Sequence, residues 1–291
     1  MRAAEALGYA PDWRFRARAR QRYNRIGLLY GSRVPIFFSL YEGFADALGD
    51  EFSRHGFDLI FIPAVAGIHD WERNARDLRL DGLIVTDPVP PHLDLILRSA
   101  GLPTVMVNHH AELPVARLVP DEADGIRQLI AHLTGLGHRR IYYYQSLHLS
   151  GHPSVIDRQQ AYRQVMGQLG LQVEIITETL PEAVRRFSAE RGPLAVIAYN
   201  CADGAGLAEG LTAAGVAIPQ RLSLVCFDDI ELTRKLGLTV VNIPRAGMGK
   251  RAARMLVDLI AGRTPLAQQT CEELYPVSLE LRSSTAVPVL G

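Results

Sequence analysis

The sequence has few cysteines, no overall charge bias and no long apolar run. Its three cysteines, Cys201, Cys226 and Cys271, lack a C-x-x-C spacing, which argues against a disulfide framework or a zinc site and for a reducing compartment. Lys plus Arg and Asp plus Glu number 31 each, so the whole chain has no general attraction to nucleic acid or membrane. No run approaches the ~18 apolar residues of a membrane span, and the first 25 residues contain no signal-peptide core. We therefore expect a cytoplasmic protein without a membrane partner.

The chain is long enough for two domains: it has 291 residues, 48% of them hydrophobic. Short apolar runs alternate with helix-length amphipathic stretches, which is the βαβ pattern of parallel sheets. Strands are predicted at 26–30, 57–63, 81–87 and 102–108, and after "LGHRR" at 141–145, 172–177, 194–200 and 222–228. Helices are predicted near 39–55, 92–100, 157–169, 182–191 and 203–214. The pattern predicts an α/β fold with two doubly wound parallel-sheet halves.

Polar residues end three of the predicted strands, directly after the apolar runs. They are Asn108, Asn200 and Asp228. In open parallel sheets ligands bind at the carboxyl ends of the strands, so these positions are candidates for a binding site. Each residue taken alone is also well suited to cap the next helix or close a turn.

One stretch, "GAGLAEG" at 204–210, imitates a dinucleotide-binding motif. Four residues separate its first glycine from the preceding strand, and small residues equally suit close packing of a helix against a sheet. The sequence contains no G-x-S-x-G elbow, no P-loop and no H-E-x-x-H motif. We expect no enzyme activity, no cofactor and no metal site.

Three segments resemble the LacI/GalR family of bacterial transcription regulators. "VPDEADGIRQLIAHLTGLGHRRIYYY" (119–144) resembles the family pattern V-x-x-D-x-x-x-G followed by H-L and G-H-R-R-I. "IPQRLSLVCFDDIEL" (218–232) is similar to the family's V-P-x-D-x-S-x-V-G-F-D-D segment, and "GKRAARMLVDLIAG" (249–262) to its late helix. The resemblance extends from about Leu7 to Thr285.

The resemblance implies a periplasmic-binding-protein-like (type I) core that binds a small-molecule effector in a cleft between two subdomains. The expected division is a headpiece remnant and hinge helix at 1–24, an N-terminal subdomain at 25–137 plus 242–269, and a C-terminal subdomain at 138–241 plus 270–291. It also implies a homodimer whose operator binding responds to the effector, a sugar or related metabolite.

Effector contacts are implied residue by residue. Phe37 matches the second aromatic of the family's N-P-F-F segment, and Arg158 matches the arginine of R-x-x-G-Y. Asn200 matches the asparagine of the family's N-D pair, whose aspartate is Cys201 here. Asp228 matches the first aspartate of F-D-D. We interpret Cys201 as a small buried filler rather than a nucleophile, because no nearby basic pattern favours a thiolate.

The N-terminus concentrates positive charge. Residues 1–25 contain seven arginines against Glu5 and Asp12. The segment "LGYAPDWRFRARARQR" resembles the end of the family's headpiece and its hinge helix, without the preceding helix-turn-helix. Arg14, Arg16 and Arg18 are the implied DNA contacts, although Arg18 stands where the family has a leucine that wedges into the minor groove.

The predicted function is therefore that of a LacI-type regulator whose partners are operator DNA, an effector and a second copy of the chain. A solute-binding protein without a DNA role is the alternative, and a nicotinamide-dependent enzyme is a further one that rests only on "GAGLAEG".

Overall fold

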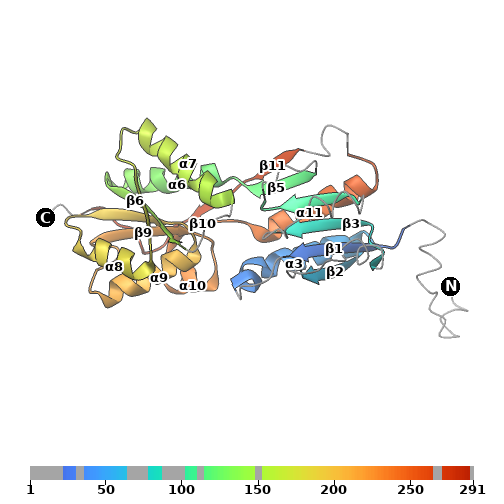
Figure 1. Cartoon of the computed structure of the whole chain (residues 1–291), viewed down its shortest axis with the longest axis horizontal. Helices are drawn as coiled ribbons and strands as arrows, with labels where there is room; N and C mark the ends of the chain where they lie inside the picture. Colours follow the sequence, from blue (N-terminus) through green and yellow to red (C-terminus); the bar gives the residue numbers. More distant parts are fainter. Residues whose placement is uncertain are drawn as a thin grey trace, which may run out of the picture. The chain divides into compact units, whose positions relative to one another are not determined.

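A computed structural model of the chain describes residues 22–30, 36–63, 78–86, 102–109, 115–147, 153–264 and 271–288. These residues form two compact units, each with its own six-stranded sheet (Figure 1). Unit 1 comprises residues 1–119 and 245–273, and unit 2 comprises 120–244 and 274–291. Within the described ranges, no helix combines the length and apolar character that a bilayer crossing requires.

Unit 1 has the strand order β11-β5-β4-β3-β1-β2, with β1 to β5 parallel wherever they pair. Its α3 and α11 pack so closely that a Cβ at Gly249 would lie 2.6 Å from the Phe44 carbonyl oxygen. Its elements are β1 (Arg25–Tyr30), α3 (Ile36–Arg54), β2 (Asp58–Pro63), β3 (Gly82–Thr86), β4 (Thr104–Val107), β5 (Ala116–Pro120), α11 (Arg245–Ile260) and β11 (Glu272–Tyr275), whose last two residues belong to unit 2.

Unit 2 has the strand order β12-β10-β9-β8-β6-β7, in which only β12 is shown to pair antiparallel to its neighbour. The strands are β6 (Ile141–Ser146), β7 (Glu174–Glu178), β8 (Leu194–Ala198), β9 (Leu222–Phe227), β10 (Thr239–Asn242) and β12 (Ser278–Glu280). The helices are α6 (Glu122–Gly135), α7 (Pro153–Gln168), α8 (Leu180–Ala189), α9 (Cys201–Ala213) and α10 (Glu231–Lys235).

The α/β fold with two parallel-sheet halves is confirmed. All eight predicted strands have a counterpart among β1 to β4 and β6 to β9. Six of them are central strands, for which branched apolar runs buried on both faces are the signature, whereas β2 and β7 lie at sheet edges. Strands β5, β10, β11 and β12 were not predicted. The predicted helix at 92–100 lies outside the described residues. We predicted that the first stretch of the N-terminal subdomain ends at residue 137, whereas the first stretch of unit 1 ends at residue 119. The two boundaries differ because α6 packs against α7 and belongs to unit 2.

The three consecutive tyrosines of β6 show how a parallel sheet uses both faces. Tyr142 and Tyr144 join the apolar cluster beneath α8 and α9, where both approach Phe187. Tyr143 points to the other face and lies 5.5 Å from the Tyr162 ring of α7. Successive residues of a strand face opposite ways, so this run of large side chains fixes a helix on each side of the sheet.

The glycines of "GAGLAEG" serve packing. A Cβ at Gly204 would lie 2.7 Å from the Cys226 sulfur of β9, and Cβ atoms at Gly206 and Gly210 would meet Leu180 and Val184 of α8 at 2.7 and 2.6 Å. Helix α9 therefore packs closely against both β9 and α8, most restrictively at Gly204, and this close packing accounts for the motif.

The two sheets repeat one detail at equivalent places. In each, the third strand of the order above ends in a residue with a left-handed backbone: Asn108 after β4 (φ 61°) and Asp228 after β9 (φ 74°). Each donates its backbone N–H to the neighbouring strand, Asn108 to the Leu118 oxygen and Asp228 to the Val241 oxygen, both at 2.9 Å. Asn and Asp are the residues other than glycine that best tolerate this conformation, so both sheets end a central strand by the same turn.

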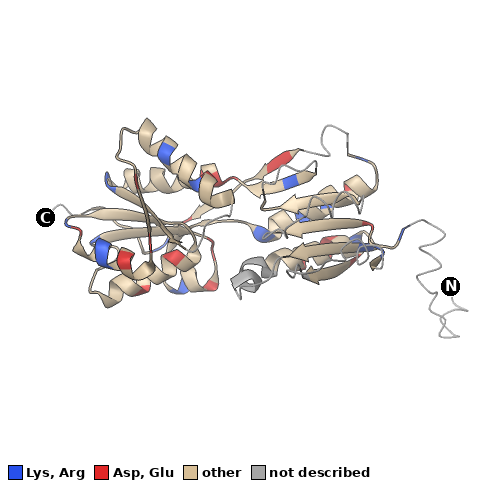
Figure 2. Cartoon of the chain, viewed as in Figure 1, with Lys and Arg blue, Asp and Glu red and all other residues tan. Residues whose placement is uncertain are grey.

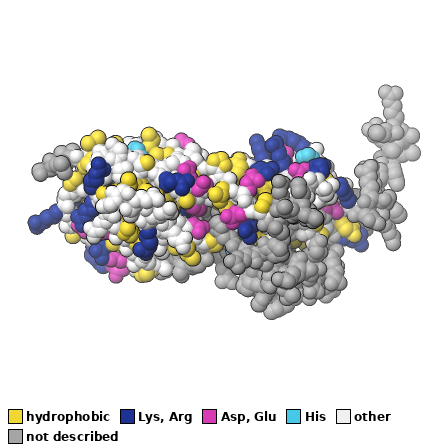
Figure 3. Space-filling model, turned by 90° about the horizontal axis from the view of Figure 1, so that it is seen from above, with side chains coloured by type: hydrophobic (Ala, Val, Ile, Leu, Met, Phe, Trp, Pro, Cys, Tyr) yellow, Lys and Arg dark blue, Asp and Glu magenta, His cyan; other side chains and the backbone are white. Residues whose placement is uncertain are grey.

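Basic and acidic residues are interspersed along the described parts of both units, as the ribbon colours show (Figure 2). On the face shown in Figure 3, Lys and Arg side chains lie next to Asp and Glu side chains. This mixture agrees with the equal numbers of basic and acidic residues in the chain.

Candidate functional site

Arg158 lies at the centre of a buried polar cluster at the carboxyl edge of the sheet in unit 2. The side chain comes from α7 and is 4% exposed. Its Nε donates to Glu122 Oε2 at 2.6 Å and its Nη2 to Glu122 Oε1 at 2.9 Å, a bidentate ion pair. Its Nη1 donates to the Tyr199 carbonyl oxygen at 2.5 Å. Arg158 thus ties α7 to α6 and to the end of β8.

Aromatic rings surround the same guanidinium. Its central carbon lies 3.7 Å from the centroid of the Phe227 ring and 4.9 Å from that of Tyr199. Burial by itself lowers the pKa of Arg158, but the Glu122 carboxylate outweighs burial and raises that pKa above its ordinary value. The side chain therefore stays charged, held by one carboxylate and by the ring faces.

Glu122 reaches this position through the start of α6. Asp121 caps the helix, its carboxylate accepting the Asp124 N–H at 2.8 Å, and Glu122 follows in the first turn. A helix N-terminus favours negative charge, which helps to offset the cost of burying Glu122 at 4% exposure. Glu122 lies in the segment 119–144 that carries the family resemblance, but its role is not apparent from the sequence, because an acid in a first helical turn is equally typical of a solvated helix start.

The structure brings three of the predicted contact residues together. Arg158 contacts Tyr199 and Phe227, and these residues directly precede Asn200 and Asp228. Asp228 is 6% exposed. Electrostatic attraction to Asp228 is among the contributions that raise the pKa of Arg158. All three predicted residues therefore belong to one edge of one sheet.

Asn200 also has a local role. It is the N-cap of α9, and its side-chain oxygen accepts the Asp203 N–H at 2.9 Å. Asp203 is itself buried and accepts the Ser146 N–H at 3.0 Å, and burial raises the pKa of its carboxyl group. The capping interpretation of Asn200 holds, and its amide nitrogen is the group that could serve a ligand.

For the other predicted site residues, the structure describes only the backbone or nothing. Phe37 is the second residue of α3, and only its backbone is described. Arg14, Arg16 and Arg18 lie outside the described residues. Cys201 is 1% exposed at the start of α9, in agreement with its interpretation as a buried filler. Nowhere in the described ranges do three His, Cys, Asp or Glu side chains gather as a metal site would require.

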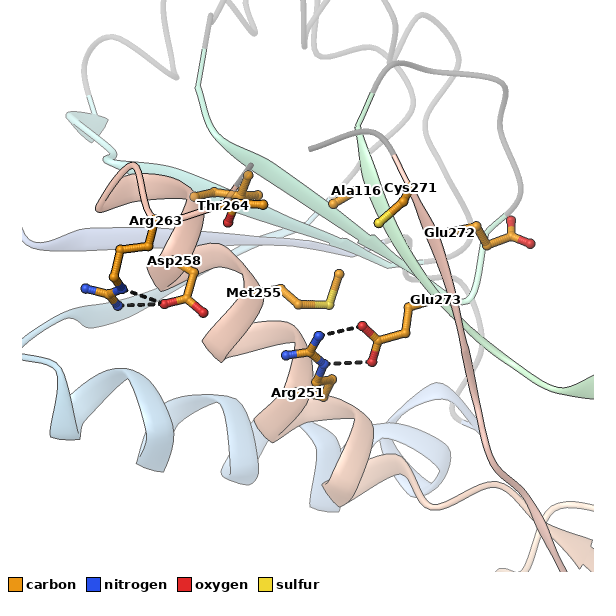
Figure 4. Close-up of a pocket in the computed structure, with 10 residues that line it drawn as sticks. Ala116, Arg251, Met255, Asp258, Arg263, Thr264, Cys271, Glu272 and Glu273 are labelled. Atoms are coloured by element: carbon orange, nitrogen blue, oxygen red, sulfur yellow. Dashed lines mark hydrogen bonds and ion pairs between the residues drawn. The ribbon is translucent and has the colours of Figure 1, made fainter. Parts of the chain in front are cut away.

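Two cavities lie away from this cluster. One, of about 380 Å³, lies in unit 1 between α11 and the start of β5 at Ala116 (Figure 4). Its charged lining forms mutual ion pairs, Arg251 with Glu273 at 2.5 Å and Arg263 with Asp258 at 2.6 Å. The other, of about 470 Å³, lies in unit 2 beside Leu238, just before β10. Both are at amino ends of strands, opposite to the edge where open α/β sheets bind ligands.

The chain is similar in sequence to known regulators. The periplasmic binding protein-like domain family matches residues 130–285. The HTH-type transcriptional regulator CelR of Thermobifida fusca is 28% identical over 293 residues, covering 90% of this chain and 82% of its own. The HTH-type transcriptional repressor PurR of Vibrio cholerae serotype O1 (strain M66-2) is 27% identical over 302 residues, covering 96% and 86%. These relatives are regulators rather than enzymes.

Solved structures share the fold. The complex of transcriptional regulator CelR with cellobiose has a TM-score of 0.76 at 24% identity, covering 97% of this chain and 88% of that chain. The Lac repressor dimer bound to operator and the anti-inducer ONPF has a TM-score of 0.79 at 19% identity, covering 96% and 99%. Both extend over nearly the whole chain, so the two-unit architecture is common to these proteins.

Proposed function

Because this chain belongs to the periplasmic-binding-protein-like domain family as a LacI-type transcriptional regulator, we propose that a neutral, hydroxyl-rich effector binds at the Arg158 edge of unit 2 and controls operator binding. The buried cluster of Arg158, Glu122, Tyr199 and Phe227 carries this proposal. We propose no catalytic role and a cytoplasmic location.

The charge of the cluster favours a neutral effector. Arg158 is already paired with Glu122, and Asp228 adds a second carboxylate to the same edge. An anionic ligand would have to approach two carboxylates with only one guanidinium to compensate, whereas hydroxyl groups can both donate to Asp228 and accept from Asn200. Three of the five N–H groups of Arg158 are engaged in the bonds above, and the second hydrogens of Nη1 and Nη2 suit a hydroxyl acceptor.

Aromatic contacts also favour a sugar as the effector. Sugars present apolar C–H faces as well as hydroxyls, and an aromatic contact from Phe37 would suit such a face. The CelR structure was solved with cellobiose, which makes that disaccharide the first probe for this chain.

Operator DNA is the proposed second ligand. Arg14, Arg16 and Arg18 supply positive charge for backbone phosphates, and a homodimer would present two such segments to a two-fold site. The effector would act by binding one arrangement of the units more tightly than the other.

The effector proposal is tested by thermal shift with cellobiose, glucose and ribose, and with gluconate as the charged counterpart. We expect at least one neutral sugar to raise the melting temperature and gluconate to leave it unchanged. Asp228→Asn should weaken the binding of that sugar by at least about tenfold in calorimetry, because a charge-assisted hydrogen bond is lost while asparagine tolerates the left-handed backbone. Cys201→Ser is the control and should change the affinity by less than about threefold. A shift by gluconate alone, or no shift by any sugar, overturns the proposal.

The DNA proposal is tested with a fluorescein-labelled 20-base-pair duplex at low salt. We expect binding that weakens steeply as salt is added, and a smaller salt dependence when Arg14, Arg16 and Arg18 are all replaced by alanine. Equal binding by the intact chain and by this triple variant would favour a solute-binding protein without a DNA role.

A further inference from the structure

The described part of the chain begins with residues 22–25, which Asp81 holds at the start of β1. We call these residues and Asp81 the junction. One Asp81 carboxylate receives two backbone N–H groups of this segment. The Tyr23 N–H lies 2.9 and 3.0 Å from its two oxygens, and the Arg25 N–H lies 3.1 Å from Oδ2. Asp81 in turn donates its own backbone N–H to the Arg25 carbonyl oxygen at 2.7 Å. The carboxylate therefore binds backbone atoms, which it can do whatever side chains the segment carries.

The backbone between the two donors explains this geometry. Asn24 has φ 57°, in the left-handed region. A left-handed residue between two donors turns their N–H groups toward the same side of the chain, which creates a concave backbone site for an anion. The Asn24 carbonyl oxygen accepts the Asp58 N–H at 2.8 Å, so the same residue is also tied to the start of β2.

The junction is thus held by both neighbours of β1. Strand β1 lies between β2 and β3 in the sheet of unit 1 (Figure 1). Asp58 begins β2 and Asp81 directly precedes β3, so the two aspartates hold the chain from opposite sides just before β1 starts. Arg22 adds a contact of its Nη2 with the Ile260 carbonyl oxygen, at 3.4 Å from the last residue of α11.

We propose that Asp81 is a positioning residue for DNA binding: it fixes the backbone of residues 23–25, to which the arginine-rich segment 8–22 is joined. The inference rests on the proposed DNA-binding function. A segment that leaves a rigid body from a fixed point loses less conformational freedom when it binds than one that leaves from a loose end, so its arginines bind phosphates more tightly.

The test compares two independent ways of breaking the junction, each in the full 291-residue chain. Asp81→Asn removes the charge that holds the two N–H groups. Asn24→Val makes the left-handed backbone unfavourable, whereas the matched control Asn24→Gly preserves it. Binding is measured with the labelled 20-base-pair duplex at low salt, and hydrogen exchange is measured on peptides that cover residues 22–30.

We expect Asp81→Asn and Asn24→Val to increase exchange at residues 23 and 25 and to weaken duplex binding by about five- to tenfold. Asn24→Gly should remain within about twofold of the unchanged chain, and circular dichroism should report a folded protein for every variant. Normal binding by the glycine variant would show that the left-handed backbone at residue 24, rather than the asparagine side chain, is what duplex binding requires.

The triple alanine variant of Arg14, Arg16 and Arg18 distinguishes a failure of the proposed DNA binding from a failure of the positioning role of Asp81. If it binds the duplex as well as the unchanged chain, the DNA function itself fails. If it loses binding while Asp81→Asn and Asn24→Val retain full affinity despite faster exchange, Asp81 holds the chain without positioning the segment, and the inference is overturned.

Discussion

At the residue scale, the pairing of Arg158 with Glu122 changes what each of them can do. A buried guanidinium of this kind would be expected to select an anionic ligand, but here both of its bidentate positions are occupied by a carboxylate at 2.6 and 2.9 Å. Desolvating two charges is costly, and their mutual attraction with the Tyr199 and Phe227 contacts compensates for that cost. Arg158 therefore has a structural role at this edge, where it joins α7 to α6 and to the end of β8.

This pairing predicts a strong coupling between the two residues. Arg158→Met or Glu122→Leu alone should lower the free energy of unfolding by about 3–5 kcal/mol, because each leaves one buried charge without its partner. The double variant should be destabilised by clearly less than the sum, since neither member of the pair is then left buried without the other. Urea denaturation of the three variants measures this, and strict additivity would contradict the role assigned to the pair.

At the scale of elements, α9 depends on how closely it can approach β9 and α8. The position of Gly204 is the most restrictive, because a Cβ there would meet both the Sγ and the Cβ of Cys226, at 2.7 and 2.8 Å. Gly206 is less restricted, since its nearest neighbour is the flexible end of Leu180. The distance between α9 and the sheet is therefore set by the close contact of Gly204 with Cys226.

Gly204→Ala should consequently destabilise unit 2 by about 1–3 kcal/mol, even though alanine is the better helix former. Gly49→Ala in α3 is the matched control, because no atom lies within 4 Å of the Cβ it would add. That control should gain about 0.5–1 kcal/mol. Thermal unfolding compares the two, and an equal gain in both would show that α9 does not need the close approach.

At the scale of the whole molecule, the proposed operator binding requires two copies of the chain. A two-fold operator is bound by a dimer with an isologous interface, so we expect a C2 homodimer. Light scattering at micromolar concentration should report about twice the chain mass of 32.1 kDa, with or without duplex DNA. A mass of 32.1 kDa under these conditions would argue against two-fold operator binding by this chain.

The two parallel-sheet halves and the polar residues at strand ends were predictable from the order of residues along the chain. These features are local: buried strands need continuous branched apolar runs, and Asn200 and Asp228 follow such runs directly in the chain. Strands β11 and β12 escaped prediction because they lie at sheet edges, are only partly buried and contain no continuous apolar run. Strands β5 and β10 were not predicted either.

The pairing of buried charged groups, in contrast, became visible only in the folded chain. Glu122 and Arg158 are 36 residues apart, and Asp81 is 58 residues from the Tyr23 N–H that it holds. No pattern along the chain marks an acid that will bind a distant guanidinium or a distant backbone amide, because the energy of burying a charge depends on what the fold brings beside it.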